Sequence, residues 1–449
     1  MKLLALAYYY PPSADSGTHR SLHLLNRLAA WGEEITVITA RQADYALGAP
    51  VDPQLAARID PRIRTVRVPV RRPLYSLVRA RALLRRQAPP MRPQDSRGAG
   101  RSGLPGRARI KDAVSGMLTY PDDHVGWIPG ALRAAAAAIR SGAIDRIYSS
   151  GGPWSSHLAA ALLKQRFRIP LVLDFRDPWA SNPDRRERSR AARLLDLRLE
   201  SLCIGLADRV VANTEPLRQD FLERYPHEAP GKFTTITNGF EPLASGAARA
   251  RSQRFTLVHA GTIYPPRDPS CLLLAARDAI REGQIRAEDL LIRFVGEFPG
   301  RVRLAALLEC CELKHAVEIM PQVAHTAALE MQREADVLVL FQNAFPLQVP
   351  RKLYEYMSLL KPVLAIAPSG GATAAIVEES GVGIVTGESA GAIKSALLQL
   401  YAQWRSGAAG IGASRLDRYR NDRLAGVLRS VLAQPLPPPS GRPADVPHA

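Results

Sequence analysis

Cysteine is scarce in this chain of 449 residues, which contains only Cys203, Cys271, Cys310 and Cys311. Their spacing does not match a zinc-binding motif, and four cysteines are too few for a disulfide-rich secreted scaffold. We therefore expect reduced, buried thiols, and the sequence argues against a structural zinc site.

Long hydrophobic runs are also missing. The apolar run at residues 3–7 ends in three tyrosines and two prolines, so it is too short for the core of a secretion signal. No other stretch approaches the roughly 20 apolar residues that a membrane-spanning helix needs. We expect a cytoplasmic protein whose only membrane contact would be peripheral, at the inner face of the cytoplasmic membrane.

Two common nucleotide-binding patterns are absent as well. Neither the glycine pattern G-x-G-x-x-G nor a Walker A phosphate-binding loop occurs in the sequence. Dinucleotide-dependent redox chemistry and P-loop hydrolysis are therefore not expected.

Acidic residues are few, and the excess of basic ones is local. There are 60 basic and 42 acidic residues, which gives a net charge of +18. Residues 62–111 hold fifteen basic residues and one acidic residue, Asp95, so this segment carries +14 of that charge. The segment favours an anionic partner, whereas the nearly balanced remainder argues against nucleic acid as a partner.

Apolar strands alternate with amphipathic helices in two successive series. Continuously apolar strands are typical of parallel sheets buried on both faces, so we predict two doubly wound α/β domains. The predicted strands are 3–7, 35–39, 63–69, 145–149, 171–175 and 209–212, then 255–259, 291–295, 317–320, 336–341 and 362–366; the predicted helices include 19–31, 154–166, 186–206, 268–282 and a terminal region at 388–433.

The composition divides the chain into three parts. We predict a first domain over 1–245, with a basic insertion at about 71–111, and a second domain over 246–433 that includes the terminal helices. Residues 434–449 are rich in proline, which predicts a disordered tail.

The loop at residues 11–18 follows the first predicted strand, where open parallel sheets bind ligands. Gly17, directly before a predicted helix, would let backbone amides approach an anionic group. A plain turn is the alternative, and the loop alone does not decide between them.

A second candidate site lies at residues 345–356. Pro350 suits the first position of a helix, so Arg351 and Lys352 would lie beside its free amides, where a diphosphate binds well. One turn later, Glu355 offers two carboxylate oxygens to the vicinal hydroxyls of a ribose. The alternative is a surface ion pair between Lys352 and Glu355.

These residues resemble the P-x-K-x-x-E-Y segment of glycosyltransferase family 4, the retaining nucleotide-sugar transferases with the two-domain GT-B fold. The stretches "YPDDHVGW", "LVLDFRDPW", "ADRVVANT", "TNGFE" and "HAGTIYPPRDP" are similar to family motifs in the same order. The resemblance covers roughly residues 1–45 and 118–400.

The resemblance implies roles for individual residues. Gly17, Arg267 and Lys352 would hold the diphosphate of the donor, and Glu355 its ribose. Asp177 and Asp122 are the candidate catalytic residues, on the side that faces the acceptor. For Asp177 a salt bridge to Arg176 or a helix cap is the alternative.

The sequence departs from the family pattern at two positions. Leu347 replaces the first of the family's paired glutamates, which contacts the transferred sugar in better-known members. Leu360 replaces a small residue at the end of the same helix. His124 and His157 are expected to be structural.

The resemblance implies transfer of a sugar from a UDP-sugar or GDP-sugar to an acceptor hydroxyl, with retention and without a cofactor or metal. The expected acceptor is a glycan or lipid-linked glycan of cell-surface polysaccharide synthesis. Residues 71–87 combine six arginines with leucines, which predicts a basic helix on an anionic membrane. The alternatives are a sugar-nucleotide epimerase on the same fold, a non-catalytic GT-B partner protein, and an adaptor that acts through its basic segment.

Overall fold

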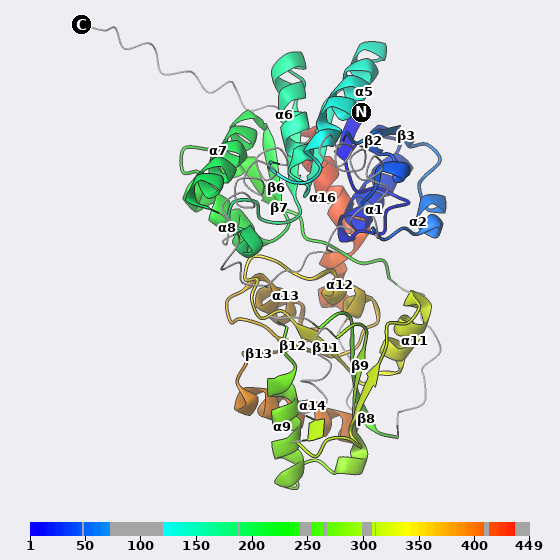
Figure 1. Ribbon diagram of the computed structural model, residues 1–449, viewed down its shortest axis with the longest axis vertical. Coiled ribbons are helices and arrows are strands. Elements are labelled where there is room, and N and C mark those ends of the chain that lie inside the picture. Colours follow the sequence, from blue (N-terminus) through cyan, green and yellow to red (C-terminus); the bar gives the residue numbers. More distant parts are fainter. Residues whose placement is uncertain are drawn as a thin grey trace, which may run out of the picture. The chain divides into compact units, whose positions relative to one another are not determined.

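The computed structural model describes residues 1–46, 49–71, 120–185, 189–242, 253–263, 267–298, 308–309, 311–407 and 413–435. The chain forms two compact units (Figure 1). Unit 1 is made of Met1–Ala212, Phe221–Thr234 and Ala425–Ala449, and unit 2 of Asn213–Asp220 and Thr235–Leu424. The predicted boundary near 245, the basic insertion after Arg71 and the tail after residue 435 lie outside the described residues.

Unit 1 is built on a sheet of seven described strands. Their order is β3 (Arg64–Val68), β2 (Glu34–Ala40), β1 (Lys2–Ala7), β4 (Arg146–Gly151), β5 (Leu171–Phe175), β6 (Arg209–Ala212) and β7 (Phe233–Thr235), and the pairs from β3 to β6 are parallel. The helices are α1 (Ser16–Ala30), α2 (Pro53–Ala57), α5 (Ile128–Ser141), α6 (Ser155–Phe167) and α7 (Arg190–Leu206). Two further helices, α8 (Glu215–Arg224) and α16 (Asn421–Ala433), are divided between the units, after Asp220 and after Leu424.

Unit 2 has a parallel sheet of six described strands. Their order is β10 (Val317–Met320), β9 (Leu290–Val295), β8 (Phe255–Ala260), β11 (Val337–Phe341), β12 (Val363–Ile366) and β13 (Gly383–Thr386). The helices are α9 (Ser270–Arg281), α11 (His325–Glu334), α12 (Arg351–Ser358), α13 (Ala372–Ser380), α14 (Ala390–Ser406) and α15 (Ala413–Leu416).

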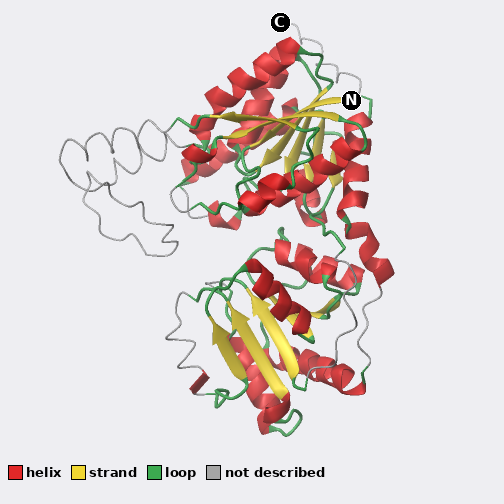
Figure 2. Cartoon of the chain, turned by 90° about the vertical axis from the view of Figure 1, so that its right-hand side faces the viewer, coloured by secondary structure: helices red, strands yellow, loops and turns green. Residues whose placement is uncertain are grey.

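Both sheets are buried on both faces, as their apolar strands predict. Every residue of β5, β8 and β11 is buried. Alternate residues of β8 serve different cores, because Phe255 and Leu257 pack with α9 and α14 whereas Val258 packs with α12 and α13. Figure 2 shows the helices that cover the sheets. The prediction of two doubly wound α/β units is confirmed.

An ion pair in the core joins α1 to β5 in unit 1. The guanidinium of Arg20 donates from Nε and Nη2 to the two carboxylate oxygens of Asp174, each over 2.8 Å. The Arg20 and Asp174 side chains are 3% and 0% exposed. Tyr148 also donates to Asp174, and burial, followed by the Asp174 charge, raises the pKa of Tyr148 far above its usual value.

Among the described residues, no helix combines the length and the apolar character that crossing a membrane requires.

Leu360, after the end of α12, has a left-handed backbone with a φ of 56°. A side chain in this region costs about 1–2 kcal/mol, and Leu360 is 48% exposed, so it gains little from burial. We expect Leu360→Gly to raise the free energy of unfolding by roughly 0.5–1 kcal/mol, because the relief of strain exceeds the entropic cost of glycine. Chemical denaturation measures the change, and Leu360→Ala, which keeps the strain, is the control; equal stability of the two variants would contradict the expectation.

Candidate functional site

Four loops of unit 2 follow neighbouring strands at the same edge of its parallel sheet. Gly261 follows β8, Gly296 follows β9, Pro321 follows β10 and Gln342 follows β11. The carboxyl ends of parallel strands are where open α/β sheets bind ligands. Of the residues predicted for a donor, Arg267 lies in the β8–α9 loop and Lys352 and Glu355 lie on α12, whereas Gly17 belongs to unit 1.

Gly261 and Lys352 are in close contact. A β-carbon on Gly261 would lie 2.6 Å from Cε of Lys352, which is closer than carbon atoms can approach, and 3.5 Å from its Nζ. Any side chain at position 261 would therefore displace the lysine. Lys352 is the second residue of α12, so its backbone amide is one of the free amides at the start of that helix.

The pKa of Lys352 is lowered. Burial is the largest cause, the charge of Glu355 acts in the opposite direction, and Arg351 and Arg267 lower the pKa further. Burial and the neighbouring positive charges both destabilise the charged form of Lys352, and a bound anion would stabilise it. The electrostatics of the loop edge therefore favour an anionic ligand.

Arg267 approaches the same edge from the β8–α9 loop. Its Nη2 donates to Oε1 of Gln342 over 3.3 Å, and Gln342 is 2% exposed at the end of β11. The charge of Arg267 also helps to lower the pKa of Lys352, so both residues add positive charge at this edge of the sheet.

Glu355 forms an ion pair with Arg351, between Oε2 and Nη2 over 3.7 Å. The partner is the residue one turn earlier on α12 and not Lys352, which the alternative interpretation of this segment expected. The Glu355 side chain is only 15% exposed. Its carboxylate is therefore held on the first turns of α12, in the segment predicted to bind a ribose.

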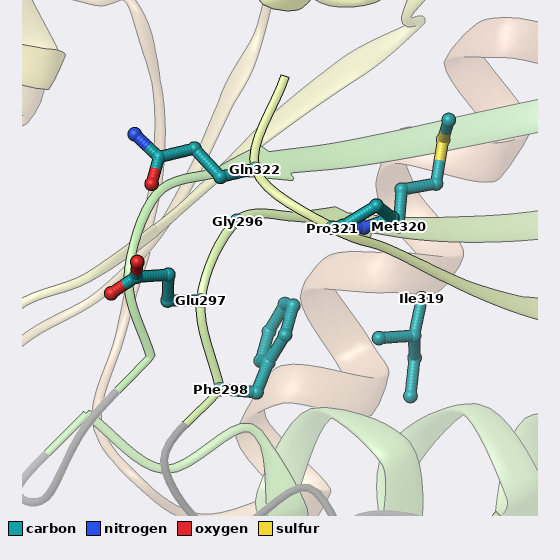
Figure 3. A pocket seen from close by; sticks show the side chains of 7 residues that line it. All are labelled: Gly296, Glu297, Phe298, Ile319, Met320, Pro321 and Gln322. Carbon is teal, nitrogen blue, oxygen red and sulfur yellow. The ribbon is translucent and has the colours of Figure 1, made fainter.

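A pocket of about 540 Å³ opens at the ends of β9 and β10 (Figure 3). Its lining consists of Gly296, Glu297, Phe298, Ile319, Met320, Pro321 and Gln322. In Figure 3 the Glu297 and Gln322 side chains lie on one side, away from Phe298 and Ile319. The lining combines apolar side chains with polar groups, and concave sites of this kind bind small molecules.

Gly296 connects this pocket to the lysine. A β-carbon on Gly296 would lie 2.4 Å from the carbonyl oxygen of Gly261, and its φ of 146° disfavours other residues. The pocket therefore adjoins Gly261, which in turn contacts Lys352. Sequence reasoning missed the pocket, because its lining comes from two loops without a charged motif.

Sequence reasoning also assigned no role to His259, in β8. It is 2% exposed, and its Nδ1 lies 2.9 Å from the carbonyl oxygen of Val339. Its Nε2 lies 3.5 Å from the same point beside Gly261 that Lys352 approaches. The signal in the sequence was a polar residue inside an otherwise apolar strand.

In unit 1, Gly17 and Asp177 both contact Arg176. A β-carbon on Gly17 would lie 2.9 Å from Cζ of Arg176, so glycine makes room for the guanidinium. Arg176 donates to Oγ of Ser16 over 2.7 Å and forms a 3.3 Å ion pair with Asp177. The alternative reading of Asp177, a salt bridge to Arg176, is therefore present in the structure.

The amide of Gly17 is already engaged, since it donates to Oδ1 of Asp15, the N-cap of α1, over 3.3 Å. A diphosphate at this position would compete with the cap. The predicted phosphate contact of Gly17 and the catalytic role of Asp177 stay predictions.

Asp122 has local hydrogen-bond partners. Its carboxylate accepts from the backbone amide and the hydroxyl of Ser155, over 2.9 and 2.7 Å, and from the amide of His124 over 2.9 Å. Burial alone would raise its pKa, but hydrogen bonds from His124 and Ser155 outweigh this and lower it. These contacts make Asp122 a rigid anionic support at the start of α6, and its catalytic role stays a prediction.

Two family models match the chain in succession. A glycosyl transferase 4-like domain matches residues 17–239, and a domain of glycosyl transferases group 1 matches residues 254–403. Among curated proteins, a D-inositol 3-phosphate glycosyltransferase of Streptosporangium roseum is 29% identical over 240 residues, which are 49% of this chain and 53% of that protein. The chain thus spans about half the length of the curated relatives it matches.

Solved structures share the fold at low sequence identity. Sucrose-phosphate synthase of Thermosynechococcus elongatus has a TM-score of 0.60 at 17% identity, with 96% of this chain and 98% of that chain covered. HepE of Anabaena, solved in complex with UDP-glucose, has a TM-score of 0.58 at 15% identity, with coverages of 96% and 99%. Together with the two family models, which follow one another along most of the sequence, this fold shows that the chain belongs to glycosyltransferase family 4, a family of enzymes with the GT-B fold.

Proposed function

We propose that the chain transfers a sugar from a UDP-sugar or GDP-sugar to an acceptor hydroxyl, and that unit 2 holds the donor. The observation that carries the proposal is the convergence at the strand ends of unit 2. Lys352 and Arg267 supply positive charge beside the amides of α12, and the adjoining pocket at β9 and β10 has room for a base. Glu355 offers its carboxylate to the ribose.

This arrangement suits the departure of a nucleoside diphosphate. As the bond between the sugar and the diphosphate breaks, negative charge develops on the phosphate and positive charge on the sugar. Lys352, Arg267 and the helix amides are preorganised donors for the developing phosphate charge. Retention of the anomeric configuration, with the leaving phosphate taking the acceptor proton, rests on family membership, and no metal is needed for the step.

The proposal also concerns the chemical class of the acceptor. The curated relatives are named for D-inositol 3-phosphate, so a glycan acceptor rests on the family resemblance and not on these names. We propose a glycan or lipid-linked glycan of cell-surface polysaccharide synthesis. The epimerase alternative differs in one respect, since it would convert the donor without any acceptor.

Glu355 provides the test of the donor site. We expect Glu355→Gln to weaken binding of UDP or GDP roughly 10-fold or more, because hydrogen bonds to a charged carboxylate contribute about 1.5–3 kcal/mol. Titration calorimetry measures the dissociation constants of UDP, GDP and their 2′-deoxy forms. The wild type should prefer the ribose form, and the variant should lose that preference. Glu282→Gln, at an exposed ion pair with Lys394, is the control and should bind as the wild type does.

If neither UDP nor GDP binds the wild type, the proposed donor is wrong. If the variant keeps the preference for ribose, the assignment of Glu355 is wrong while the donor site stands.

The proposed membrane partner draws support from α7. Leu194, Leu195, Leu197 and Leu202 are 40–50% exposed on this helix. Exposed arginines flank these leucines on the same helix, at positions 190, 193 and 198, whereas the acidic residues of α7 are buried. Exposed leucines and arginines on one helix face favour an anionic lipid surface.

We expect Arg193→Gln with Arg198→Gln to weaken binding to vesicles of phosphatidylglycerol roughly 30-fold, since each basic residue contributes about 1 kcal/mol. Co-sedimentation measures the binding, with phosphatidylcholine vesicles as the uncharged comparison. The control pair is Arg281→Gln with Arg286→Gln, because these arginines already pair with carboxylates in unit 2. Equal losses in both pairs would contradict a specific role of α7.

A further inference from the structure

The hydrogen bond to Val339 determines which nitrogen of His259 carries the proton. A carbonyl oxygen can only accept, so Nδ1, 2.9 Å away, must be the donor. In the neutral ring Nε2 then carries a lone pair and can only accept. The Phe341 ring packs against the imidazole edge to face, with centroids 5.1 Å apart, and holds the ring in this orientation.

The surroundings keep His259 neutral. Burial lowers its pKa to about 3, the hydrogen bond to Val339 opposes this, and the charges of Lys352 and Arg267 lower the pKa further. At neutral pH the ring is therefore uncharged, and Nε2 remains an acceptor.

Nε2 is buried and has no hydrogen-bond partner among the residues that the structure describes. Nε2 lies 3.5 Å from the position that a β-carbon on Gly261 would occupy, and Nζ of Lys352 lies 3.5 Å from the same position. The two nitrogens therefore lie near the same space beside Gly261, which Cε of Lys352 can occupy because residue 261 is glycine. A buried acceptor without a donor is uncommon in folded proteins, and it needs an explanation.

The chemistry of Nε2 limits what it can bind. It cannot contact a phosphate oxygen directly, because both atoms would be acceptors. An ammonium has three N–H donors and no acceptor, so it can donate to Nε2 and to a phosphate at once. Lys352 is the ammonium that borders the same space.

We propose that His259 is a positioning residue of the donor site: when a nucleoside diphosphate binds, Nε2 accepts one N–H of Lys352 and so aims the remaining N–H groups at the diphosphate. The inference rests on the proposed function of unit 2. It assigns His259 no contact with the donor itself.

Two substitutions separate the two nitrogens of the ring. His259→Asn can keep a donor to Val339 but has no acceptor in the place of Nε2. His259→Gln can place an acceptor near Nε2. The ligands are UDP and GDP, compared with uridine and guanosine, which lack the diphosphate.

We expect His259→Asn to weaken binding of the diphosphate about 10-fold and to change binding of the nucleoside less than 2-fold, whereas His259→Gln recovers most of the loss. In a Lys352→Met background the effect of His259→Asn should disappear, because the two residues act through one hydrogen bond. An equal loss for nucleoside and diphosphate, or a loss that persists without Lys352, would overturn the inference.

If His259→Asn does not fold, nitrogen-15 spectra of the wild-type imidazole test the same point. The Nε2 resonance should shift on addition of UDP or GDP, but not with the nucleoside alone; an unchanged resonance with the diphosphate bound overturns the inference. If the wild type binds neither diphosphate, the proposed function itself fails.

Discussion

Lys352→Met should lower kcat/KM for donor turnover by roughly 100- to 1,000-fold, which is the usual effect of removing one preorganised donor to a developing oxyanion. Methionine keeps the apolar stem that packs beside Gly261 and removes the ammonium, so the fold should be retained. Because the charge is needed most in the transition state, kcat should fall more than KM rises. Steady-state release of UDP or GDP from the donor sugar measures both.

Lys394→Met is the matched control. Lys394 is also a lysine of unit 2, but it pairs with Glu282 at the surface. It should turn over the donor at the wild-type rate. Similar losses in the two variants would show that Lys352 has no special role.

The role of Lys352 also makes donor binding depend on pH. Lys352 must be protonated to hold the diphosphate, and burial places its pKa below that of an ordinary lysine. Affinity should therefore be full below the pKa of Lys352 and should fall as pH rises through it, at a lower pH than for an ordinary lysine. In Lys352→Met this alkaline loss should be absent.

The second large effect concerns stability. Asp174→Asn should lower the free energy of unfolding of unit 1 by about 3–5 kcal/mol, because it leaves the buried guanidinium of Arg20 without its counter-charge. The melting temperature should fall by roughly 10 °C. Differential scanning calorimetry measures the fall in melting temperature.

A double substitution tests the cause. Asp174→Leu with Arg20→Met removes both charges and should recover much of the loss, since well-packed apolar residues often replace a buried pair without cost. Glu34→Gln, at an exposed pair with Lys2, is the control and should change stability by less than about 1 kcal/mol. If Asp174→Asn behaves like this control, the pair does not stabilise unit 1.

Sequence alone predicted most of the sheet architecture. Largely apolar stretches such as 171–175, in which Asp174 is the one charged residue, and 337–341 have few alternatives to buried parallel strands, and both are strands here. The prediction missed β13 (Gly383–Thr386), a four-residue strand that begins with glycine. Such short strands are stabilised by their neighbours and carry little pattern of their own.

The sequence predicted those parts of the candidate site that lie in one continuous segment. It did not predict contacts between residues that are far apart in the sequence. The sequence of residues 350–356 predicted the start of a helix that contains Lys352 and Glu355. In the structure both residues lie on α12. The contact between Gly261 and Lys352 and the buried nitrogen of His259 depend on neighbouring strands. In unit 1, the packing of Arg176 against Gly17 supplies a structural reason for that glycine, which the loop sequence did not reveal.

Hydrogen exchange of the whole chain with and without UDP or GDP tests whether unit 2 holds the donor. If it does, exchange should slow on ligand binding at residues 259–263, 295–298 and 350–356, at the ends of β8 and β9 and the start of α12. The protection should be weaker in Lys352→Met. Protection that avoids these segments while a nucleotide is bound would contradict the assignment of the donor site to unit 2.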